Sequence, residues 1–205
     1  MSEFPVLRMT DLNPDPVETF KVWYDRAIQK SGLVNPNAMV LSTIGHDGFP
    51  DGRVLLLKNV RDGHFVFFTN RQSNKGTALA DNPKASLTFW WENLGRQVRV
   101  VGAVQAVPEA ESDAYFASRP RGSRIGAWAS EQSRPLESRD ALERRVRELE
   151  EKWPSGADIP RPPHWGGYAL EPVRIEFWQE GPFRLHDRFR YDQVGERWTL
   201  TRLYP

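Results

Sequence analysis

Five apolar runs lie close together in the first half of the chain and decide its fold: AMVLSTI (38–44), RVLLLKNV (53–60), FVFFTN (65–70), ASLTFWWE (85–92) and QVRVVGAVQAV (97–107). Each has the length and the β-branched and aromatic content of a β-strand. Turn signals such as His46-Asp47-Gly48 and Asp62-Gly63 separate them. Short strands joined by tight turns pair antiparallel as a meander, and such sheets close into small barrels. The sequence therefore predicts a mainly β fold built on an antiparallel barrel.

Helical patterns flank these runs. Asp15 followed by Pro16 predicts the start of a helix that ends at Gly32. Three further helices are expected over residues 75–82, 109–118 and 138–153. Two or three C-terminal strands are expected at VRIEFWQ (173–179), RLHDRFRY (184–191) and WTLTRLY (198–204). We interpret residues 1–14 as a loose N-terminal arm and residues 15–205 as a single domain.

Composition excludes several classes of function. The 205 residues hold 28 Lys and Arg against 27 Asp and Glu, a net charge of +1 that argues against a nucleic-acid partner. The chain has no cysteine, and its four histidines have no second ligand at metal spacing, so no catalytic metal is expected. No apolar run approaches the ~20 residues of a membrane span, and the first residues do not resemble a signal peptide. A cytoplasmic protein without a membrane partner is expected.

Two basic segments are candidates for binding an anion. Residues 118–135 are rich in Arg, Ser and Gly without an apolar period, which predicts a long ordered loop. Within them, SRPRGSR (118–124) has the composition of a phosphate clamp, although an exposed basic loop would look the same. RVLLLK (53–58) is an apolar strand, expected to be buried, with a cation at each end that could also simply reach solvent.

The segment RLHDRFRY carries the most charge on one strand. A period of two places Arg184, His186, Arg188 and Arg190 on one face. Four such groups repel one another unless an anion lies among them, although local ion pairs on a solvated face would give the same pattern. The neighbouring Trp178 favours a ligand, because a flat aromatic ring beside cations suits a ring-bearing anion.

Taken in order, the segments resemble the pyridoxamine 5′-phosphate oxidase family, whose fold is an FMN-binding split β-barrel. The motifs that carry the resemblance are RVLLLK, FFTN, NPKASLTFWW, RQVRVVG, YFASRPRGSRIGAWAS, FWQ and RLHDRF. The likeness extends from about Asp15 to Pro205. It implies an antiparallel split barrel with flanking helices, FMN as cofactor, and a homodimer that holds FMN at the subunit interface.

The resemblance also implies individual site residues. Those implied for FMN are Arg53, Val54, Leu55, Leu56, Leu57, Lys58, Phe68, Thr69, Lys75, Gln97, Gln132, Ser133, Trp178 and Arg188. Those implied for the substrate phosphate are Lys58, Tyr115, Arg119 and Ser123, while Arg184 and His186 would lie over the substrate ring and are the catalytic candidates. Asn74 departs from the family, which commonly has arginine there, so a weaker hold on FMN is expected.

The implied reaction is the FMN-dependent oxidation of pyridoxamine 5′-phosphate or pyridoxine 5′-phosphate by oxygen. The products would be pyridoxal 5′-phosphate and hydrogen peroxide, with ammonia from the amine. Two alternatives stay open: a split-barrel flavin oxidase for another ring system such as a dihydrophenazine, and a non-catalytic flavin-binding protein. The complete substrate-phosphate set argues against the first, and the presence of Arg184 and His186 argues against the second.

Overall fold

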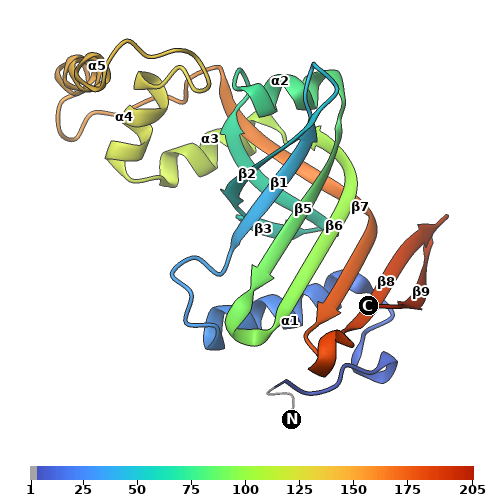
Figure 1. Ribbon diagram of the computed structural model, residues 1–205. Coiled ribbons are helices and arrows are strands. Elements are labelled where there is room, and N and C mark those ends of the chain that lie inside the picture. The colour runs from blue at the N-terminus through green and yellow to red at the C-terminus, as the bar shows by residue number, and fades with distance from the viewer. Residues whose placement is uncertain (1–3) are drawn as a thin grey trace.

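Residues 4–205 are described by the computed structural model, in which nine antiparallel strands form one sheet (Figure 1). The strands are β1 (Ala38–Ile44), β2 (Pro50–Leu56), β3 (Asn59–Arg61), β4 (His64–Asn70), β5 (Lys84–Trp91), β6 (Arg96–Ala106), β7 (Trp165–Gln179), β8 (Asp187–Val194) and β9 (Arg197–Leu203). The flanking helices are α1 (Pro16–Lys30), α2 (Asn74–Asp81), α3 (Glu109–Ser118), α4 (Arg121–Ala129) and α5 (Arg139–Lys152). The expected antiparallel split barrel with flanking helices is confirmed.

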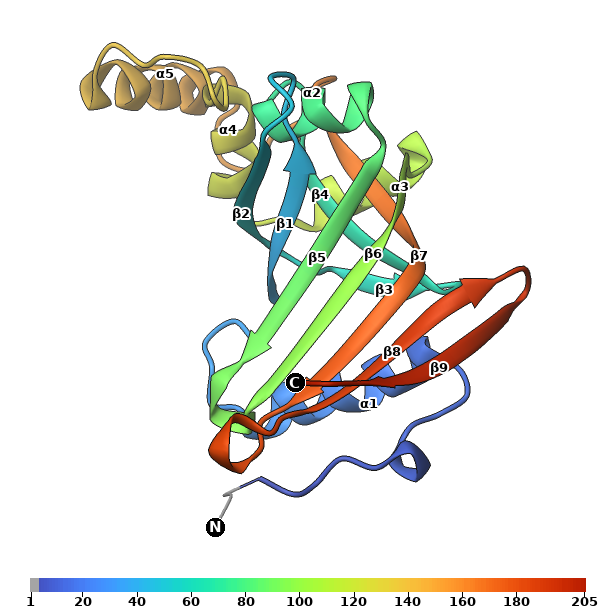
Figure 2. The same cartoon turned by 45° about the vertical axis from the view of Figure 1, so that its right-hand side comes forward.

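Strand β7 is the branch point of the sheet. It pairs with β6 along most of its length, with β4 through residues 165–170 and with β8 through residues 174–179. The strand order is β2-β1-β5-β6-β7-β4-β3, which differs from a simple meander because β1 pairs with β5 and β4 pairs with β7. Figure 2 shows the β8–β9 hairpin leaving the barrel at the far end of β7. The two ends of β7 therefore belong to different parts of the molecule.

Helix α1 packs aromatic side chains into the barrel core. Asp15 begins the helix as predicted, since its Oδ1 accepts a hydrogen bond from the Val17 N–H at 2.8 Å. Phe20 is fully buried, with its ring centroid 4.8 Å from that of Phe65 and 5.0 Å from that of Phe89. Burial of such a side chain stabilises the fold by about 1.5–3 kcal/mol.

A second apolar cluster attaches α3 and α4 to the sheet. Trp165 at the start of β7 is 7% exposed and packs against Phe116 of α3, with 5.1 Å between ring centroids. Ile125 of α4 belongs to the same cluster. This packing fixes residues 119–123 beside the first half of β7.

The prediction of a loop over residues 118–135 was wrong, because residues 121–129 form helix α4. Ile125 and Ala129 lie one turn apart and are both buried, so they supply the apolar stripe of a short helix. The arginines, serines and glycines around these two residues conceal this stripe in the sequence.

The second predicted strand is divided in two. Strand β2 ends at Leu56 and β3 begins at Asn59, because the Leu57 side chain turns into the core and is only 2% exposed. The expectation that this strand is buried was also wrong. Strand β2 lies at one end of the strand order, and Val54 is 67% exposed.

The strand predicted over residues 184–191 begins only at Asp187. Pro182 cannot donate to a strand ladder, and Phe183 and Arg184 have φ of 55° and 65°, which breaks the extended backbone. Arg184 and His186 therefore precede the strand, and the prediction that they share its face with Arg188 and Arg190 was wrong. The period of two holds from Asp187 onward, with Phe189 and Tyr191 buried.

The N-terminal arm is less loose than expected over the residues that the structure describes, while residues 1–3 lie outside them. Leu7 and Leu12 belong to the main core, and the Leu7 N–H donates to Asp187 Oδ2 at 2.9 Å. Within residues 4–205, no helix combines the length and the hydropathy needed to cross a membrane.

Candidate functional site

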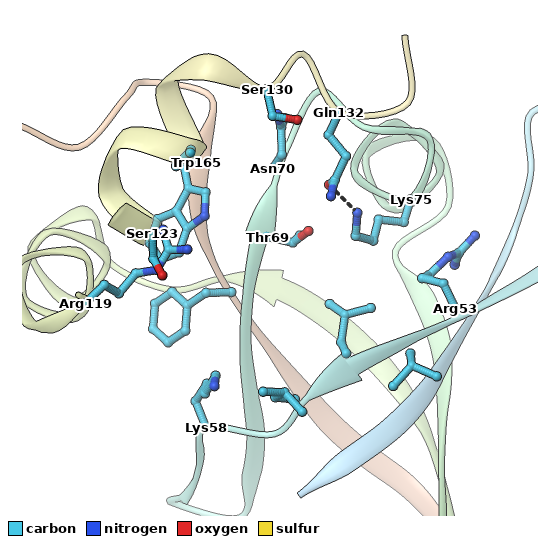
Figure 3. A pocket seen from close by; sticks show the side chains of 16 residues that line it. Arg53, Lys58, Thr69, Asn70, Lys75, Arg119, Ser123, Ser130, Gln132 and Trp165 are labelled. Atoms are coloured by element: carbon cyan, nitrogen blue, oxygen red, sulfur yellow. Dashed lines mark hydrogen bonds between the residues drawn. The ribbon is translucent and has the colours of Figure 1, made fainter. Parts of the chain in front are cut away.

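A cavity of about 690 Å³ lies between strands β2 and β4 and helices α2 and α4 (Figure 3). Its volume is within the range of small-molecule sites. The predicted residues that line it are Arg53, Val54, Leu55, Leu56, Lys58, Phe68, Thr69, Lys75, Arg119, Ser123 and Gln132. Four of them are cations, and none of the described lining residues is Asp or Glu. Three of the cations, Lys58, Lys75 and Arg119, have no acidic partner within residues 4–205, so the cavity favours an anionic ligand.

Lys75 forms one cationic corner of the cavity. It lies in the first turn of α2, is 7% exposed, and donates from Nζ to Ser73 Oγ at 2.9 Å and to Gln132 Oε1 at 2.6 Å. Burial, and then the nearby charge of Arg53, lower the pKa of Lys75 to about 8. A buried ammonium with neutral acceptors gains most from an anion, because the anion offsets both effects.

Arg53 completes this corner from strand β2. Its Nη1 donates to the Leu41 carbonyl at 3.2 Å and to Thr43 Oγ1 at 2.8 Å, and its Nη2 pairs with Asp51. These bonds hold the guanidinium on the side of the cavity where Lys75 and Gln132 lie, as Figure 3 shows.

Arg119 forms a second cationic corner across the cavity, beside Ser123 (Figure 3). Its guanidinium carbon lies 4.8 Å from the centroid of the Trp165 ring. The Nη1 atom is buried and has no hydrogen-bond partner within residues 4–205. Burial lowers the pKa of Arg119. Because burial disfavours the charged guanidinium, an anionic ligand beside Arg119 would offset this cost.

Aromatic rings support the same corner. Phe68 stacks on Tyr115 with 4.1 Å between ring centroids, and Lys58 Nζ lies 6.0 Å from the centre of the Tyr115 ring. Tyr115 is therefore next to the cavity through Phe68, although it does not line it.

A separate group of predicted residues lies at the far end of β7. Gln97, Trp178 and Arg188 are direct cross-strand neighbours on β6, β7 and β8. The His186 ring centroid lies 4.5 Å from that of Trp178, and Arg184 is exposed in the turn before β8. We call these five residues the distal group.

No residue of the distal group lines the cavity of the same chain. Trp165 lines the cavity and Trp178 belongs to the distal group, and they are thirteen residues apart on strand β7. At about 3.3 Å per residue, the strand separates them by roughly 40 Å. One chain therefore brings together only part of the predicted site.

Two predicted residues lie beside the cavity without lining it. The Leu57 side chain lies in the core. Ser133 adopts a φ of 72°, and its Oγ accepts a hydrogen bond from the Asn74 N–H at 3.2 Å, which ties the loop after α4 to the start of α2.

Sequence reasoning missed lining residues that carry little chemical signal: Asn70, Gly126, Ala127, Ser130 and Trp165. Trp165 is the important one, because its ring supports Arg119. The only signal for it is a tryptophan that follows a proline-rich stretch and precedes two glycines, which indicates the start of a strand but not a cavity.

Two family models together match most of the chain. Residues 27–153 match the model described as pyridoxamine 5′-phosphate oxidase, and residues 165–205 match the one described as the pyridoxine 5′-phosphate oxidase C-terminal dimerisation region. The second match covers β7, β8 and β9 and contains every residue of the distal group except Gln97, which lies on β6.

Curated relatives with the name pyridoxine/pyridoxamine 5′-phosphate oxidase match almost the whole chain. The one from Cupriavidus necator is 53% identical over 200 residues, which cover 97% of this chain and 93% of the relative. The one from a Cyanothece strain is 50% identical over 199 residues, covering 97% and 92%.

Solved structures agree with this relationship. PhzG from Burkholderia lata, determined with tetrahydrophenazine-1-carboxylic acid, is 32% identical, covers both chains completely and superposes with a TM-score of 0.91. An FMN-binding protein from Nostoc punctiforme shares the fold at 18% identity, with a TM-score of 0.72 and coverage of 91% of this chain and 97% of that one. The chain belongs to the pyridoxamine 5′-phosphate oxidase family.

Proposed function

We propose that the protein oxidises pyridoxamine 5′-phosphate or pyridoxine 5′-phosphate to pyridoxal 5′-phosphate, with FMN as cofactor and oxygen as the final electron acceptor. The cavity carries the proposal, because its lining within residues 4–205 has four cations and no carboxylate. Its two separate cationic corners fit two phosphorylated ligands, one at each corner. Bound FMN would supply the redox chemistry, taking two electrons from the 4′ carbon of the substrate and passing them to oxygen, which leaves as hydrogen peroxide.

The corner formed by Lys75 and Arg53 would hold the FMN phosphate. Gln132 orients the Lys75 ammonium, and Val54, Leu55 and Leu56 offer a strand edge against which a flat ring can lie. Phe68 and Thr69 would contact the cofactor from β4. The corner formed by Arg119, Ser123 and Lys58 would hold the substrate phosphate, beside Tyr115.

The distal group would come from a second copy of the chain. In a dimer with two-fold symmetry, the distal group of each subunit can reach the cavity of its partner, which gives two equal sites. The match to the dimerisation region supports this arrangement, as do the exposed apolar side chains of Val40, Ile44 and Val54 on β1 and β2. Arg184 would then position the 4′ carbon of the substrate, and His186 would provide a polar contact.

The test begins with the absorbance spectrum of the purified protein. We expect flavin bands near one equivalent per chain, and oxygen consumption with hydrogen peroxide release on addition of either phosphate ester. Flavin without turnover of either ester would instead indicate a non-catalytic flavin-binding protein. Absence of flavin binding would refute the proposal.

A phenazine oxidase is the second candidate, favoured by the similarity to PhzG. The relatives named pyridoxine/pyridoxamine 5′-phosphate oxidase are more similar in sequence, and Lys58, Tyr115, Arg119 and Ser123 are all present. We therefore expect the phosphate esters to be turned over faster than a dihydrophenazine carboxylic acid under the same conditions.

Arg119→Ala should weaken substrate binding without loss of the bound flavin. Loss of a charge-assisted contact to phosphate costs about 1.5–3 kcal/mol, so the apparent substrate affinity should fall by roughly 10- to 100-fold. The absorbance of bound flavin should stay near that of the wild type. A folded but colourless variant would show that Arg119 belongs to the FMN corner.

FMN affinity should fall as the pH rises above 8. Lys75 has a pKa of about 8 in the FMN-free protein, and a bound phosphate favours its protonated form, so above pH 8 binding must first take up a proton. The dissociation constant should increase by up to about tenfold per pH unit above 8. Flavin fluorescence titrations at pH 7, 8 and 9 measure this, and Lys75→Met should abolish the dependence.

A further inference from the structure

We propose that Glu176 is a positioning residue that holds the guanidinium of Arg188 ready to contact the flavin. The inference rests on the proposed function, in which Arg188 belongs to the distal group. Glu176 lies on β7 two residues before Trp178, on the same face of the strand. Only 6% of Glu176 is exposed, so its carboxylate is buried within a row of exposed and half-buried side chains.

The contacts of Arg188 define how it is held. Glu176 Oε1 accepts from Arg188 Nε at 3.0 Å and from Nη2 at 2.8 Å, and the Tyr204 carbonyl accepts from Nη1 at 3.1 Å. A guanidinium has five N–H groups. Within residues 4–205, these bonds use three of them and leave two N–H groups for a ligand.

Glu176 is itself fixed from the opposite side. Its Oε2 lies 3.6 Å from Arg99 Nη1 on β6, while Arg188 approaches from β8. A buried carboxylate needs such partners, because desolvation is costly when the charge is unpaired. The carboxylate between two strands is therefore a rigid support, and Arg188 loses little further rotamer freedom when a ligand binds.

The register of β7 and β8 shows that the contact between Arg188 and Glu176 runs diagonally between the two strands. Arg188 faces Trp178 directly across the β7–β8 ladder, whereas Glu176 faces Arg190. The guanidinium therefore crosses diagonally to Glu176, which aligns it along the sheet. Without Glu176, the hydrogen bond to the Tyr204 carbonyl would be the only one of these three bonds left to hold the side chain.

Asp192 on β8 provides a matched control, because it lies on the same face of the paired strands β7 and β8 as Glu176. Its carboxylate contacts Arg174 Nε at 2.8 Å and Arg190 Nε at 2.7 Å, and neither arginine is expected to contact FMN. Asp192→Asn therefore weakens one cross-strand ion pair, with Arg174 of β7, and one ion pair within β8, with Arg190, without touching Arg188. If Glu176 had a purely structural role, Glu176→Ala and Asp192→Asn would change the FMN dissociation constant equally.

The experiment is a double-mutant cycle on the FMN dissociation constant, measured by fluorescence titration of FMN-free dimers. Glu176→Ala should weaken FMN binding roughly tenfold, and Glu176→Gln less, because its amide oxygen still accepts a hydrogen bond. In an Arg188→Ala background, Glu176→Ala should cause no further loss. Asp192→Asn should stay within about twofold of the wild type. Sedimentation and circular dichroism check assembly and folding.

Three results would overturn the inference: additive effects in the cycle, an equal loss in Asp192→Asn, or wild-type affinity in Glu176→Ala. If Glu176→Ala does not fold, the same cycle with Glu176→Gln decides between additive and coupled effects. The proposed function fails separately, because a wild-type protein that does not bind FMN at all would show it before any variant is compared.

Discussion

Replacement of Lys75 by methionine should weaken FMN binding by roughly 10- to 100-fold, because it removes a charge-assisted hydrogen bond to the phosphate at nearly constant side-chain volume. The FMN-free protein should become more stable at pH 7. Folding lowers the pKa of Lys75 from 10.5 to about 8, so the protonated lysine is less favourable in the folded chain than in the unfolded chain. Thermal unfolding with and without FMN measures both effects together.

The prediction is specific because Lys75→Met should lower the FMN affinity and raise the stability of the FMN-free protein. Lys84→Met, at an exposed lysine at the start of β5, should change neither the FMN affinity nor the shift in melting temperature caused by FMN. Lys75→Arg should retain part of the affinity, since it keeps the charge but not the shape. If Lys75→Met destabilises the FMN-free protein and leaves FMN affinity unchanged, Lys75 is a structural residue and the phosphate binds elsewhere.

Local patterns predicted the elements of the fold well where apolar periodicity was strong. The strands around Phe65 and Trp91, and the hairpin at Gly195, lie where they were expected. The errors occur where the conformation of one or two residues interrupts the strand pattern of the residues around them. Leu57 turns into the core and breaks an apolar run, and the positive φ of Phe183 and Arg184 delays β8 until Asp187.

The pairing of the strands could not be predicted from local patterns. Turn signals indicate which consecutive strands form hairpins, but the pairing of β4 with β7 joins residues about a hundred positions apart. That pairing places Trp165 beside Phe68 and thereby builds the wall on which Arg119 lies. It is set by the burial of apolar faces across the whole chain, which no short segment reveals.

The candidate site shows the same limit more clearly. The resemblance implied Lys75 and Trp178 as residues of one site, yet they lie in different groups of the same chain. A sequence names residue types and does not say which copy of the chain supplies each one. The proposed function therefore needs a second copy of the chain to supply the distal group, because the distal group does not line the cavity of its own chain.

Hybrid dimers should test this division between subunits directly. A dimer with one Arg119→Ala chain and one Arg184→Ala chain should have about half of the wild-type activity, although both parent homodimers are nearly inactive at low substrate concentration. In the hybrid, one cavity combines both substitutions, whereas the other joins an intact cavity to an intact distal group. Co-expression of the two chains with different affinity tags, followed by two purification steps, isolates the hybrid for assay of oxygen consumption.

The matched control carries the same two substitutions on one chain, paired with a wild-type chain. Each site of that hybrid then contains one substituted residue, so it should be nearly inactive at the same substrate concentration. If each site were built within a single chain, the two hybrids would exchange behaviour: the control would have half activity, and the first hybrid would have almost none. Because the two dimers contain identical side chains, a difference in folding or in tag position cannot produce that reversal. The assay therefore decides whether the roughly 40 Å between the two ends of β7 is bridged by the partner subunit.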